Sequence, residues 1–140
     1  MNIYRALAIL VAALSVGISP VAPIAIAQRV PGEALEIVQA GNGVYSLNSR
    51  FREFITAASV TIDDDGNAEL TFWDENENPV TLTGEVTRWV PFGVKISVTG
   101  ANIADLRGTA DVQFSTDNAI GSIFVAGTLN GDRFSINFSQ

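Results

Sequence analysis

The 140-residue sequence contains no cysteine and no histidine, and it has only one lysine, Lys95. Without cysteine there can be no disulfide framework, no thiolate metal site and no cysteine nucleophile. Without histidine the chain lacks the commonest general base and metal ligand, and it cannot form a Ser-His triad. A Gly-rich phosphate loop and a nucleophile elbow are also missing. We therefore expect no enzyme, no catalytic residues, no cofactor and no metal site.

Basic residues are scarce, with 8 lysines and arginines against 15 aspartates and glutamates, so the formal net charge is −7. An acidic chain without a basic stripe is a poor partner for nucleic acid or for anionic lipid headgroups. Acidity of this kind keeps a domain soluble. We therefore expect no nucleic-acid partner.

The only long hydrophobic run lies at the N-terminus and has the layout of a secretory signal peptide. A short basic start precedes an apolar stretch over residues 6–18, and residues 25–27 form the small-x-small sequence Ala-Ile-Ala. Signal peptidase accepts that pattern, so we predict cleavage after Ala27. An uncleaved membrane anchor is the alternative, but Pro20 and Pro23 interrupt the run that a spanning helix needs.

Removal of residues 1–27 leaves residues 28–140, which we predict to be a single exported β domain. A chain of this length can bury a core and fold alone. The prediction is a protein of the bacterial cell envelope, periplasmic or secreted, with no membrane span after cleavage.

From about residue 58 to residue 138, short segments alternate apolar and polar residues. In one of them Ala68, Leu70 and Phe72 point one way and their neighbours the other. This period of two gives each strand one apolar face toward the core and one polar face toward solvent, as in antiparallel sheets. Turn residues recur at intervals of about ten residues, which favours a sandwich or a barrel. We predict an all-β antiparallel meander of about seven or eight strands in one of these two architectures.

The segment before residue 58 is harder to assign. Residues 33–40 fit a strand that closes on an Asn42-Gly43 hairpin turn, although a short helix also fits them. Phe54, Ile55 and Ala58 continue a stripe from Phe51 at helical spacing, with Asn48 or Ser49 as a cap. We therefore predict a short N-terminal helix over about residues 49–58.

Acidic residues could bind calcium or act in acid–base catalysis, but the spacing in this sequence supports neither. The run Asp63-Asp64-Asp65-Gly66-Asn67 resembles a calcium loop in composition only. With Gly66 as the loop glycine, the first ligand would fall on Thr61 and the twelfth on Phe72. Acid–base catalysis needs a pair of carboxylates. Glu69, Glu85 and Asp111 lie on the polar phase of their strands, and no sequence feature pairs them.

Aromatic residues near turns are the strongest candidates for a contact surface. Trp89 and Phe92 flank a proline beside Arg88, and Trp73 lies on the polar phase of its strand next to an acidic turn. An exposed apolar tip of this kind can contact a partner. The alternatives are that Trp89 and Phe92 plug one end of the core and that Trp73 packs against the N-terminal segment. We predict Trp73, Arg88, Trp89 and Phe92 as binding residues.

Two functions remain open. The first is a non-catalytic binding or interaction module that meets a protein or an envelope component. The second is a small lipocalin-like carrier of an apolar ligand, since an eight-stranded barrel is just wide enough to hold one. Gly43-Val44-Tyr45 resembles the opening of lipocalin-like barrels, but the usual tryptophan is absent and the strand spacing differs, so we assign no family.

Overall fold

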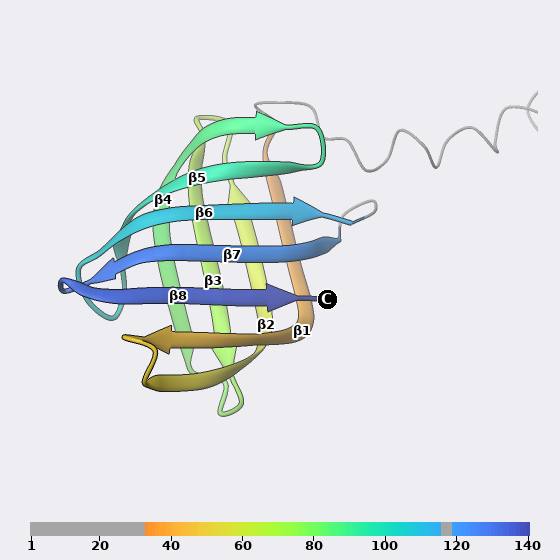
Figure 1. Cartoon of the computed structure of the whole chain (residues 1–140). Helices are drawn as coiled ribbons and strands as arrows, with labels where there is room; N and C mark the ends of the chain where they lie inside the picture. Colours follow the sequence, from red (N-terminus) through yellow and green to blue (C-terminus); the bar gives the residue numbers. More distant parts are fainter. Residues whose placement is uncertain (1–32, 116–118) are drawn as a thin grey trace, which may run out of the picture.

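The computed structural model describes residues 33–115 and 119–140, and they form eight antiparallel strands that close into a barrel (Figure 1). The all-β meander is thus confirmed, and of the two architectures the barrel is the one present. Each strand pairs with its neighbour in sequence, and β1 also pairs with β8. The strands are β1 (Leu35–Leu47), β2 (Phe51–Ile62), β3 (Asn67–Asp74), β4 (Pro79–Val90), β5 (Gly93–Ala101), β6 (Leu106–Phe114), β7 (Ile120–Leu129) and β8 (Asp132–Ser139).

The barrel closes because β1 turns a corner. In Figure 1, β5–β8 cross β2–β4 at a steep angle, and β1 runs along both groups. Its pairing with β2 shifts register between Ala40 and Gly43. The hairpin turn predicted at Asn42-Gly43 is therefore wrong, since the strand continues to Leu47. A Cβ on Gly43 would lie 2.6 Å from the Asn137 carbonyl oxygen. A glycine is therefore needed here because β8 approaches closely, and not because the chain turns.

The helix predicted over about residues 49–58 is also wrong, because these residues belong to the β1–β2 turn and β2. The pairing of β2 with β3 shifts register between Ile55 and Ala57. One extra residue there turns both Ile55 and Ala58 inward, although they are three positions apart. A β-bulge thus reproduces the spacing that a helix would have.

Several turn predictions are confirmed. Asn130 and Gly131 have φ angles of 50° and 87°, which a two-residue type I′ hairpin requires. The expected turns at 63–66, 74–79 and 91–93 also separate consecutive strands. The predicted turn at 116–118 and the predicted signal peptide with its cleavage site lie outside the described residues.

The barrel interior is packed with apolar side chains from all eight strands. Many of them expose none of their surface, among them Ala58, Val60, Leu106, Val125 and Ile136. The rings of Tyr45 and Phe134 meet edge to face with centroids 5.0 Å apart. A cavity of ligand size would leave accessible surface on the side chains around it. Near-zero exposure of these residues therefore means that they line no such cavity.

Gln39 completes the closure where the β1–β8 pairing stops. That pairing begins only at Asn42, so the earlier part of β1 has no β8 partner. The Gln39 side chain reaches β7 instead. Its amide nitrogen donates to the Ile120 carbonyl oxygen at 2.8 Å, and its oxygen accepts from the Ile120 N–H at 2.8 Å. One side chain thus replaces a pair of backbone hydrogen bonds.

Replacement of Gln39 by leucine should destabilise the barrel by about 1–3 kcal/mol, because it leaves a backbone donor and acceptor of Ile120 without partners. Urea unfolding measures the loss. Gln113→Leu is the matched control, since Gln113 is exposed on β6; it should change stability by less than about 0.5 kcal/mol. Equal effects of the two substitutions would contradict this role of Gln39.

Candidate functional site

The outer face of the barrel carries a continuous cross-strand row of residues that includes two phenylalanines. Phe54 on β2 is opposite Val44 on β1, Val44 is opposite Asn137 on β8, and Asn137 is opposite Phe124 on β7. Phe54 is 64% exposed and Phe124 is 46% exposed. Large aromatic side chains are seldom left this bare. The row is therefore the first candidate for a contact surface.

Between these two phenylalanines the surface is hollowed. The two side chains between them, Val44 and Asn137, are short, so the rings stand above them as walls. Three strand spacings separate Phe54 from Phe124, a distance on the order of 14 Å along the sheet. The hollow, which we call the outer groove, has a volume of about 700 Å³ and is lined by Asn42, Gly43, Val44, Phe54, Ser122, Ile123, Phe124, Asn137, Phe138 and Ser139.

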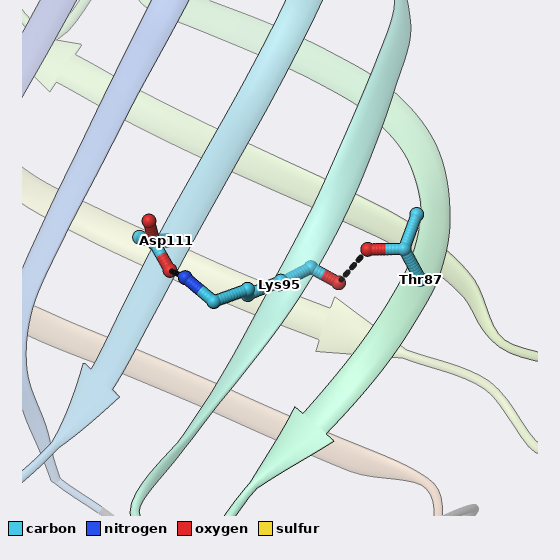
Figure 2. Close-up of polar contacts among 3 residues, drawn as sticks. All are labelled: Thr87, Lys95 and Asp111. Carbon is cyan, nitrogen blue, oxygen red and sulfur yellow. Dashed lines mark hydrogen bonds and ion pairs between the residues drawn. The ribbon is translucent and has the colours of Figure 1, made fainter.

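The same row continues past Phe124 into an ion pair. Asp111 on β6 is opposite Phe124, and Lys95 on β5 is opposite Asp111. The Lys95 Nζ lies 2.5 Å from the Asp111 Oδ1, as Figure 2 shows. The Thr87 hydroxyl donates to the Lys95 carbonyl oxygen at 3.2 Å. The pair neutralises both charges, so the border of the groove next to Phe124 has no net charge.

The four residues predicted as binding residues do not form one cluster. Arg88, Trp89 and Phe92 lie together in the β4–β5 hairpin, with Arg88 and Phe92 exposed and Trp89 packed partly against the core. Trp73 is half-buried at the far end of β3, opposite Ala57 and Pro79. The two groups are at opposite ends of the barrel. Their role in binding stays a prediction.

Sequence reasoning missed the outer groove for two reasons. Phe54 fits a stripe at helical spacing in the sequence, and only the β2 bulge puts it on the outer face. Phe124 sits between Ile123 and Val125, both buried, so its outward phase was visible in the alternation. The sequence does not show that Phe124 and Phe54 line the same groove, because that depends on the pairing of β1 with β8.

Each of the two acidic turns is stabilised by hydrogen bonds to the carboxylate of its first aspartate. The Asp63 carboxylate accepts hydrogen bonds from the backbone N–H groups of Asp65 and Asn67 and from the Asn67 side chain. Asp74 accepts the equivalent bonds from Asn76 and Asn78. Bonds from the Asn67 side chain and backbone lower the pKa of Asp63, and bonds from the Asn78 backbone and side chain lower that of Asp74. These carboxylates serve as turn acceptors.

Of the three strand carboxylates considered for acid–base catalysis, the structure brings two to one hollow. Glu69 and Glu85 are exposed and line a second hollow of about 410 Å³ on β3 and β4, whereas Asp111 lies elsewhere in its ion pair. Glu53 lies near Tyr45, and burial first and then this carboxylate raise the pKa of the Tyr45 phenol. Within residues 33–115 and 119–140, no three aspartates or glutamates are placed to hold a metal ion.

No protein-family model, curated protein or solved structure matches this chain. In the part of the chain that the structure describes, no helix is long and apolar enough to cross a membrane. The outer groove is therefore identified from its geometry alone.

Acid should weaken the fold through Asp63 and Asp74. Their pKa values are lowered in the folded state, so the stabilisation is present above the ordinary aspartate pKa and is lost as the pH falls through the lowered values. Urea unfolding between about pH 5 and about pH 2 should show a smaller loss of stability in Asp63→Asn/Asp74→Asn than in the wild type. Asp64→Asn, in the first turn, is the control and should keep the wild-type slope.

The ion pair beside the groove should contribute little to stability. Both side chains are partly exposed, and such pairs are worth about 0.2–1 kcal/mol. A double-mutant cycle with Lys95→Met and Asp111→Asn should give a coupling energy in that range. The looser pair of Arg107 and Asp105, at 3.9 Å, is the comparison and should give a coupling near zero. A coupling above about 2 kcal/mol for the first pair would contradict this assignment.

Proposed function

We propose that this protein is an exported, non-catalytic binding module that holds its ligand in the outer groove. The observation that supports the proposal most strongly is the pair of exposed rings, Phe54 and Phe124, which stand on either side of a hollow of about 700 Å³. Ligand sites typically have volumes of about 300–1,000 Å³. Isolated exposed apolar residues need no explanation, but two rings around one hollow do.

The packed interior supports this function over that of a carrier. A carrier needs space inside the barrel, and the inward side chains have almost no accessible surface. The enclosed pocket next to Tyr45, Phe72 and Ile136 has a volume of only about 10 Å³. That is room for about one water molecule. In an eight-stranded barrel filled by side chains, a binding surface has to lie on the outside.

A titration with Nile red, a neutral dye that fluoresces in apolar surroundings, tests the location of the site. Phe54→Ser and Phe124→Ser should each weaken dye binding by about tenfold, since each removes one wall of the groove. Phe92→Ser is the matched control, because Phe92 is 49% exposed but lies in the β4–β5 turn. It should leave dye binding unchanged.

Two other results would overturn the proposal. Saturable dye binding that survives both groove substitutions would place the ligand inside the barrel and favour the carrier. Loss of dye binding in Phe92→Ser alone would move the site to the β4–β5 hairpin, where the sequence placed it. Urea unfolding of each variant verifies that the fold is intact, as expected for substitutions of exposed side chains.

A further inference from the structure

We propose that the ligand of the outer groove is an uncharged saccharide chain. This inference rests on the function proposed above and adds the chemical class of the ligand. It follows from three properties of the groove: its lining is neutral, its polar side chains have no partners, and its walls are aromatic.

The lining is neutral in a protein whose formal net charge is −7. The chain has 23 charged residues counted as 8 basic and 15 acidic, yet none of the ten lining residues is charged. At the border beside Phe124, Lys95 and Asp111 neutralise each other. The overall negative charge repels anionic ligands, and a groove for a cationic ligand would place a carboxylate within it. A neutral ligand fits this surface best.

The polar side chains of the groove are available to a ligand. Asn42, Asn137, Ser122 and Ser139 line the hollow, and their side chains make no hydrogen bond within residues 33–115 and 119–140. Each of these side chains can both donate and accept. Sugar hydroxyl groups also donate and accept, so they match this set, whereas an aliphatic ligand would leave it unused.

The two walls supply the apolar part of saccharide recognition. A sugar ring presents a face of C–H groups, which packs on the electron-rich face of an aromatic ring. Phe54 and Phe124 are separated by about 14 Å along the sheet, which is longer than a single sugar ring. Both walls can therefore be contacted at once only by a chain of several rings. The groove is open to solvent and so can accept the middle of a long chain.

Affinity electrophoresis in native gels tests the inference. The gels contain one polysaccharide each: a neutral β-glucan, a neutral α-glucan, a neutral galactomannan, or alginate as the acidic polymer. We expect at least one neutral polymer to retard the protein, and Phe54→Ser or Phe124→Ser to weaken the interaction by at least about tenfold. Phe92→Ser should behave as the wild type. Titration of the retarding polymer in solution should give the same affinity at about 0.1 M and about 1 M salt.

Each other outcome overturns the inference. Arg52 is exposed on β2, two residues before Phe54. Retardation by alginate alone, lost at high salt and in Arg52→Gln, would mean that the ligand is acidic and is bound through this arginine. No retardation by any neutral polymer would exclude an uncharged saccharide of these classes. If Nile red still binds at the groove in that case, only the saccharide assignment fails. If Nile red also fails to bind there, the proposed function fails with it.

Amide resonances of the wild-type protein provide a second readout that needs no variant. The neutral polymer should shift the signals of Val44 and Asn137, which lie between the walls. Shifts confined to the β4–β5 turn would place the saccharide outside the groove and contradict the proposal.

Discussion

Closure of the sheet between β1 and β8 is the constraint on which the rest of this structure depends. A closed barrel has no free edge, so every strand gains a partner on both sides. Closure requires β1 to follow two differently oriented groups of strands, and the register shift between Ala40 and Gly43 lets it turn. The absence of a side chain on Gly43 lets β8 approach, and Gln39 bridges the stretch that β8 does not reach.

The packed interior and the outer groove are two consequences of the same alternation. Each strand directs its large aliphatic residues inward, where eight strands leave just enough room to pack them. What remains outside is a convex sheet of mostly short side chains. On such a sheet, two tall rings such as Phe54 and Phe124 create a hollow without any loop or lid. The site is therefore as rigid as the strands that support it, and a rigid site costs little conformational entropy on binding.

No charged side chain lines the groove. The acidic turns on either side of β3 retain their carboxylates in hydrogen bonds to their own backbone. The single lysine is used to neutralise Asp111 beside Phe124. An acidic protein thus presents one neutral surface with aromatic walls and amide and hydroxyl groups. That combination favours ligands that are themselves uncharged and rich in hydroxyl groups.

The sequence by itself determined the all-β class, the alternation that fills the core, and hairpin turns such as Asn130-Gly131, because these depend on neighbouring residues. The sequence pattern gave wrong predictions at two β-bulges, where the period of two is broken. The bulge at Asn42-Gly43 resembles a turn, and the bulge next to Ile55 resembles a helix. Only the tertiary structure decided between barrel and sandwich and put Phe54 and Phe124 on either side of β1 and β8. Both depend on pairing between β1 and β8, which are far apart in the sequence, and no local pattern encodes that contact.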